Sequence, residues 1–150
     1  MGPSSTEPAG STSVFAARLS ELSQMVHLVR ARCVQLGAAP ELIVRIELAL
    51  EELFANTVHH GYRSEDGGHI WIRIEQNADG IRVIYEDSAP AYNPLAMAAD
   101  ALDGTHGSDD PETRPVGGLG RMLVARLSTE NSYAYDNVRQ HNVVRLEFFP

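Results

Sequence analysis

Hydrophobic residues recur at alternating spacings of four and three from Phe15 to Leu36, which predicts an amphipathic helix. Gly37 follows directly and favours a helix end there, because glycine readily adopts the left-handed conformation that closes many helices. Since the spacing also fits a heptad, the stripe is expected either to pack on the sheet of its own domain or to form a dimer seam. Its members are Phe15, Leu19, Leu22, Val26, Val29, Cys33 and Leu36.

A second helix is predicted from Pro40 to about Gly61. Proline suits the first turn of a helix, where its missing N–H removes no hydrogen bond. The apolar positions then repeat with the helical period, at Leu42, Ile43, Ile46, Leu50, Leu53 and Phe54. The candidate chemistry lies among the polar residues beside this stripe.

Apolar residues recur at every second position over 70–74 and over 81–85, which predicts two strands. The intervening Asn77-Ala78-Asp79-Gly80 is a turn sequence, so these strands are expected to form an antiparallel hairpin. Two further strands are predicted over 132–135 and 143–148, separated by a polar turn.

Residues 88–116 show no sustained periodicity, except for a short Ala-rich helix predicted near Leu95 to Leu102. A loop of this length in a small domain is usually functional or disordered. A glycine-rich turn at 117–120 then leads into an apolar helical segment. This order of elements predicts an α+β fold, a two-layer α/β sandwich with helices on one face of a mixed, mainly antiparallel sheet.

The chain has 150 residues, of which 43% are hydrophobic, and this suits one compact domain. Residues 1–13 are mostly small and polar and contain Pro and Gly, which predicts a disordered tail before a domain over 14–150. No apolar run approaches the roughly 18 residues of a membrane span, and the N-terminus does not resemble a signal peptide. A cytoplasmic protein is therefore expected.

The formal net charge of -8 argues against direct nucleic-acid binding, because non-specific affinity for nucleic acids rests on clustered Lys and Arg. All 12 basic residues are Arg, which excludes chemistry that needs a lysine ammonium, including a Walker P-loop and a eukaryotic-type kinase site. Cys33 is the single cysteine, so no intramolecular disulfide can form.

Glu52 and Asn56 are four residues apart on the second predicted helix, so they share one face beside the apolar stripe. They can converge on one ligand, whereas Glu47 and Glu51 are expected to project from the opposite flank. On an isolated helix, the simpler interpretation would be a solvated acidic face with an incidental asparagine.

Two later features extend this pattern. Asp87 ends the second hairpin strand, where a fixed acceptor can take a hydrogen bond from an exocyclic amine. In the glycine turn, the missing side chains let backbone N–H groups approach a polyphosphate at a helix N-terminus. Taken alone, Asp87 also fits a turn-forming residue, and the glycines also fit a simple helix start.

In this order, the Glu52–Asn56 pair, Asp87, the long loop and the glycine turn resemble the N box, G1 box, ATP lid and G2 box of the GHKL ATPase superfamily, which has the Bergerat fold. The segments EELFANTVHHGY, DSAPAYNPL and RPVGGLGRMLV are similar to those of bacterial stand-alone serine kinase anti-sigma factors. The resemblance extends from about residue 15 to residue 149.

The resemblance implies a role for each matching residue. Asn56 would coordinate Mg²⁺ on the phosphates of ATP, Glu52 would be the catalytic base, and Asp87 would contact the adenine amino group. Arg114 and Arg121 are both candidates for the positive charge that phosphoryl transfer needs. The implied ATP-binding set is Asn56, Asp87, Ala89, Tyr92, Arg114, Gly117, Gly118, Leu119, Gly120 and Arg121.

The resemblance also implies partners. The protein would phosphorylate a STAS-type anti-sigma-factor antagonist, sequester a sigma factor and form a homodimer. One departure is Ala89, because the G1 box usually has glycine there. Its methyl group restricts the backbone and points toward the base, and both weaker and unchanged nucleotide binding stay open as alternatives. The alternative is a catalytically inactive nucleotide-binding module, against which the retained Glu52 and Asn56 argue.

Overall fold

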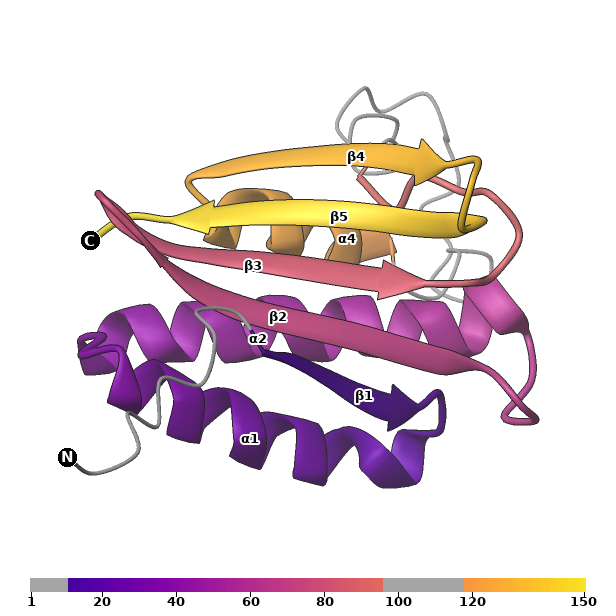
Figure 1. Cartoon of the computed structure of the whole chain (residues 1–150), viewed down its shortest axis with the longest axis horizontal. Helices are drawn as coiled ribbons and strands as arrows, with labels where there is room; N and C mark the ends of the chain where they lie inside the picture. Colours follow the sequence, from indigo (N-terminus) through magenta and orange to yellow (C-terminus); the bar gives the residue numbers. More distant parts are fainter. Residues whose placement is uncertain (1–10, 96–117) are drawn as a thin grey trace, which may run out of the picture.

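The computed structural model describes residues 11–95 and 118–150, with the backbone alone at 118–122. Its strands are β1 (Thr12–Ala16), β2 (His69–Asn77), β3 (Gly80–Asp87), β4 (Glu130–Asp136) and β5 (His141–Phe148). Its helical elements are η1 (Leu19–Glu21), α1 (Leu22–Gln35), α2 (Pro40–Asn56), η2 (Thr57–Tyr62) and α4 (Gly118–Leu127). The strands form one sheet in the order β1-β2-β3-β5-β4, and Figure 1 shows α1, α2 and α4 on one side of it. The expected α+β sandwich is confirmed, and every pairing between the described strands is antiparallel.

The prediction of the first helix is wrong in its N-terminal part. Thr12–Ala16 form a strand paired with β2, and α1 begins only at Leu22. Phe15 is buried on the core side of β1 and packs edge to face on Phe54 of α2, with 6.4 Å between ring centroids. The spacing from Phe15 to the apolar residues of α1 therefore matched a helical period, although Phe15 lies in a strand. Thr12 and Ser13, assigned to the tail from the sequence, belong to the sheet, while residues 1–10 lie outside the described part.

The core lies between the sheet and the helices. The predicted hairpin is confirmed, and its inward positions Ile70, Ile72, Ile74, Ile81, Val83 and Tyr85 are all buried. Cys33 of α1 is also in this core, where burial, followed by the charge of Glu47, raises the pKa of its thiol to about 11. Cys33 is thus a protonated packing residue at neutral pH rather than a nucleophile.

Helix α2 lies between α1 and α4 in the helical layer (Figure 1). Arg30 of α1 binds both carboxylate oxygens of the buried Glu47, at 2.6 and 2.9 Å, which removes Glu47 from the candidate chemistry. Beyond Asn56 the helix continues as the π-helical segment η2 and ends at Arg63, which has a left-handed φ of 58°. Such π-helical turns are rare and occur frequently at functional sites.

Helix α4 begins at Gly118, so Gly118, Leu119 and Gly120 form its first turn rather than a turn that precedes it. At its other end, Arg45 of α2 donates a hydrogen bond to the carbonyl oxygen of Leu127 at 3.0 Å. A cation at a helix C-terminus is favourable because of the helix dipole. Helix α4 is therefore anchored to α2 at the end opposite to its glycines.

Candidate functional site

Asn56 is the last residue of α2 and is only 3% exposed. Its buried Nδ2 has no hydrogen-bond partner among the described residues. Leaving a buried amide unpaired costs free energy, and native proteins pair nearly all such groups. The Asn56 amide therefore fits a ligand, because its N–H suits a phosphate oxygen and its carbonyl oxygen suits Mg²⁺.

Glu52 lies one helical turn before Asn56. The spacing of four residues places the two on the same face of α2. Glu51 and Glu52 are both half-buried, so exposure does not distinguish them as candidate bases. The choice of Glu52 therefore rests on its position relative to Asn56, and its catalytic role stays a prediction.

Asp87 ends β3 and is 1% exposed. Its Oδ1 accepts hydrogen bonds from Asn142 Nδ2 at 2.8 Å and from the Ala89 N–H at 3.1 Å. Its Oδ2 accepts from Thr57 Oγ1 at 3.0 Å and from Tyr92 Oη at 3.4 Å. Burial raises the pKa of the Asp87 carboxyl, while the hydrogen bonds from Asn142 and Thr57 oppose that rise. The structure thus places a fixed acceptor in a buried position, as recognition of an amine requires.

Thr57 joins the two parts of the site. It follows Asn56 in the chain, and its hydroxyl contacts both Asp87 Oδ2 and Tyr85 Oη. Tyr85 Oη also lies 3.0 Å from the carbonyl oxygen of Leu53 in α2, and burial keeps the pKa of its phenol well above its usual range. These contacts fix the end of α2 against the end of β3, which brings Asn56 and Asp87 into one region.

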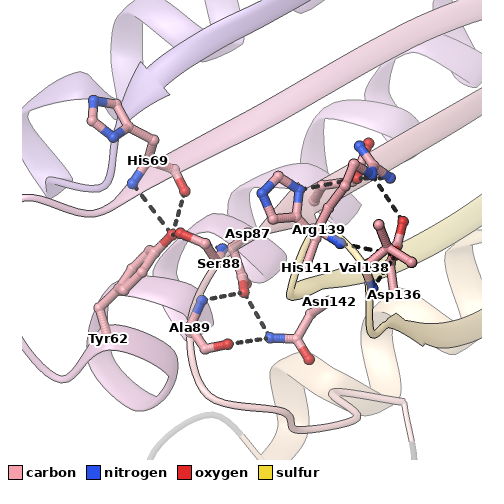
Figure 2. A network of polar contacts seen from close by, with 11 residues as sticks. Tyr62, His69, Asp87, Ser88, Ala89, Asp136, Val138, Arg139, His141 and Asn142 are labelled. Atoms are coloured by element: carbon pink, nitrogen blue, oxygen red, sulfur yellow. Dashed lines mark hydrogen bonds and ion pairs between the residues drawn. The ribbon is translucent and has the colours of Figure 1, made fainter.

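Asn142 of β5 holds the loop that follows β3. It lies opposite Asp87 in the antiparallel register, and Figure 2 shows its side chain pointing to Asp87 and Ala89. Its Nδ2 donates to Asp87 and to the Ala89 carbonyl oxygen at 3.1 Å, and its Oδ1 accepts from the Tyr92 N–H at 3.0 Å. One buried amide thereby positions both the acceptor and the loop beside it.

Ala89, which replaces the glycine usual in the G1 box, is 1% exposed and faces η2. A Cβ atom added at Gly61 would lie 3.2 Å from the Ala89 Cβ and 3.2 Å from Tyr92 Cε1. The missing side chain at Gly61 therefore leaves space for the Ala89 methyl group.

Tyr62, at the end of η2, holds the start of the same loop. Its hydroxyl donates to the His69 carbonyl oxygen at 2.6 Å and accepts from the Ser88 N–H at 2.8 Å (Figure 2). The end of η2, the start of β2 and the residue after Asp87 are thus tied by one phenol.

Three residues that support the site were not singled out from the sequence: Thr57, Tyr62 and Asn142. Asn142 carried a usable signal, because it is a polar residue at an inward position of a strand that continues with Val144 and Leu146. An inward polar side chain in a strand has to find a partner. Tyr62 and Thr57 carried no comparable signal.

The remaining predicted site residues are only partly covered by the structure. Gly118, Leu119, Gly120 and Arg121 lie in the first turns of α4, where the backbone alone is described. Arg114, Gly117 and residues 96–102 of the short helix expected near 95–102 fall outside the described residues. Across the described ranges, no helix is long and apolar enough to cross a membrane, and no three or more His, Cys, Asp or Glu side chains are grouped to hold a metal ion.

Comparison with known proteins assigns most of the chain to one family. Residues 15–148 match the family described as histidine kinase-like ATPase domain. Over 100 residues the chain is 26% identical to the serine-protein kinase RsbW of Listeria monocytogenes and 25% identical to that of Listeria innocua. The match covers 67% of this chain but only 63% of those relatives. The SiaB–SiaC complex from Pseudomonas aeruginosa has a similar fold, with a TM-score of 0.55 at 17% identity over 91% of this chain and 87% of that chain.

Proposed function

The chain belongs to the GHKL-type family of histidine kinase-like ATPase domains, and from this we propose that it binds Mg·ATP and acts as a serine/threonine protein kinase. The serine-protein kinases among its relatives support this class of activity. The observation that carries the proposal is the Thr57–Asp87 contact, because it joins the end of α2, with Asn56, to the buried acceptor at the end of β3.

Each residue then has a role that suits its chemistry. Asp87 accepts a hydrogen bond from the adenine amino group, and Asn56 holds the metal and the phosphates. Mg²⁺, when bound, neutralises charge on the phosphates. Glu52 accepts the proton of the substrate hydroxyl. Backbone N–H groups in the first turn of α4 face the phosphates, as helix N-termini commonly do, with Arg114 or Arg121 as a further positive group.

The proposal extends to partners. The substrate is a serine or threonine of a STAS-type anti-sigma-factor antagonist, and the same protein sequesters a sigma factor in a cytoplasmic partner-switching circuit, as a homodimer. The similarity to RsbW kinases supports this assignment. Nucleotide state would select the partner, because the γ-phosphate changes the charge and the surface around the site.

Replacing Glu52 by glutamine is expected to slow phosphoryl transfer by about 10²- to 10⁴-fold, the usual contribution of a general base. The measurement is transfer of label from γ-labelled ATP, with Mg²⁺, to a co-encoded STAS-type antagonist. Glu51→Gln is the matched control, since Glu51 is an equally half-buried neighbour on the other flank of α2. Both variants are expected to bind ATP as the unchanged protein does.

Two results would count against this assignment. An equal loss of transfer in Glu51→Gln and Glu52→Gln would show that Glu52 is not the specific catalytic base. No transfer by the unchanged protein, despite binding between the two proteins, would favour the alternative of a nucleotide-binding interaction module without kinase activity.

A further inference from the structure

The carboxylate of Asp87 is already saturated with donors. A carboxylate offers about four lone-pair positions, and four protein groups occupy them. Asn142 Nδ2 and the Ala89 N–H bind Oδ1, while Thr57 Oγ1 and Tyr92 Oη bind Oδ2. A further donor that approaches this buried carboxylate has to displace one of the four.

Three of these donors are held in place by other parts of the fold. The Ala89 N–H belongs to the backbone next to Asp87, and Asn142 is fixed across the β3–β5 register. Thr57 is buried at the end of α2, where Tyr85 also binds its hydroxyl. None of these donors can leave without a change in the packing of the core.

Tyr92 differs from the other three donors. Its contact with Oδ2 is the longest, at 3.4 Å, and its half-buried side chain comes from the loop after β3. Its ring lies over η2 at a glycine, since a Cβ atom at Gly61 would be 3.2 Å from Tyr92 Cε1 and 3.3 Å from Tyr92 Oη. The phenol therefore packs closely on Gly61 beside the acceptor, where a side chain would crowd it by a few tenths of an ångström.

We propose that Tyr92 is a resident competitor for the base subsite, whose hydroxyl holds the position on Asp87 Oδ2 that the amino group of an adenine nucleotide takes when it binds. The proposal rests on the proposed function, because it assumes that Asp87 recognises the base. Binding then exchanges one hydrogen bond on Asp87 for another, so part of the affinity is lost in moving Tyr92 aside. Tyr92 thus sets how tightly the site binds ATP.

The test is isothermal titration of Mg·ATP into the unchanged protein, Tyr92→Phe and Tyr62→Phe. Tyr92→Phe keeps the ring but removes the competing hydroxyl, so ATP is expected to bind about five-fold tighter, which corresponds to one ordinary hydrogen bond. Tyr62→Phe loosens the same loop at Ser88 but leaves all four Asp87 donors in place, so its affinity is expected to stay the same or fall.

Each outcome separates the two claims. Tighter ATP binding by Tyr92→Phe, but not by Tyr62→Phe, supports Tyr92 as the competitor for the base subsite. The same conclusion follows if Tyr92→Phe is the one protein of the three that binds ATP measurably. Equal tightening in both variants would attribute the effect to loop mobility and overturn the proposal. Unchanged or weaker binding by Tyr92→Phe would overturn it while ATP binding stands, and absence of binding by all three proteins would overturn both.

Discussion

Replacing Asn56 by alanine is expected to lower the affinity for Mg·ATP by at least about 100-fold. Removing a group that merely orients a metal ligand already costs roughly 10- to 100-fold in metal affinity, and Asn56 is proposed as the ligand itself. The fold is expected to persist, because the Asn56 Nδ2 makes no hydrogen bond to the described residues. Calorimetric titration with ATP and Mg²⁺ measures the loss, and thermal unfolding reports on the fold.

Asn137→Ala provides the matched control, because it makes the same substitution at an exposed position in the β4–β5 turn. It is expected to bind Mg·ATP as the unchanged protein does. If Asn56→Ala keeps its full affinity, Asn56 holds neither the metal nor the phosphates. The assignment of the α2 end as the phosphate side of the site would then be wrong.

Replacing Asp87 by asparagine is expected to weaken ATP binding by about 100-fold and to reverse the preference between adenine and hypoxanthine nucleotides. The neighbours dictate how the new amide lies. Asn142 Nδ2 and the Ala89 N–H can only donate, so the asparagine oxygen stays on their side. Its NH₂ group then faces the position of Oδ2, where the hydroxyls of Thr57 and Tyr92 can rotate to accept.

In that orientation the variant offers a donor where the unchanged protein offers an acceptor. The adenine amino group is then opposed by another donor, whereas the carbonyl oxygen of hypoxanthine is matched. Parallel titrations with ATP and ITP measure the reversal, and a thermal melt shows whether the variant is folded. A folded Asp87→Asn variant that still prefers ATP would show that the base is recognised elsewhere.

Much of the fold was predictable because its apolar patterns are simple. Apolar residues at every second position over 70–74 and 81–85 predicted the hairpin, and the helical period after Pro40 predicted α2. The strand β1 was missed, since a five-residue edge strand with one buried position, Phe15, offers too little alternation to compete with a helical spacing. Its place in the sheet depends on pairing with β2, more than 50 residues away, which no local pattern records.

The candidate site was predictable in part for a similar reason. Asn56 and Asp87 each stand at the end of an element with a clear period, so their positions followed once those elements were recognised. Asn142 reaches Asp87 only through the register of β3 with β5, a separation of 55 residues. Tyr92 turns back to Asp87 and packs closely on Gly61, a contact that only the three-dimensional packing reveals.

Asp87 is proposed as the buried acceptor that recognises the amino group of adenine. Calorimetric titration of the unchanged protein with ATP and with ITP, each with Mg²⁺, tests it most directly, because the two nucleotides differ at the group in question. ATP is expected to bind, and ITP is expected to bind at least about 10-fold more weakly, since ITP displaces Tyr92 without replacing its hydrogen bond. Equal affinity for the two nucleotides, or binding of neither, would contradict it.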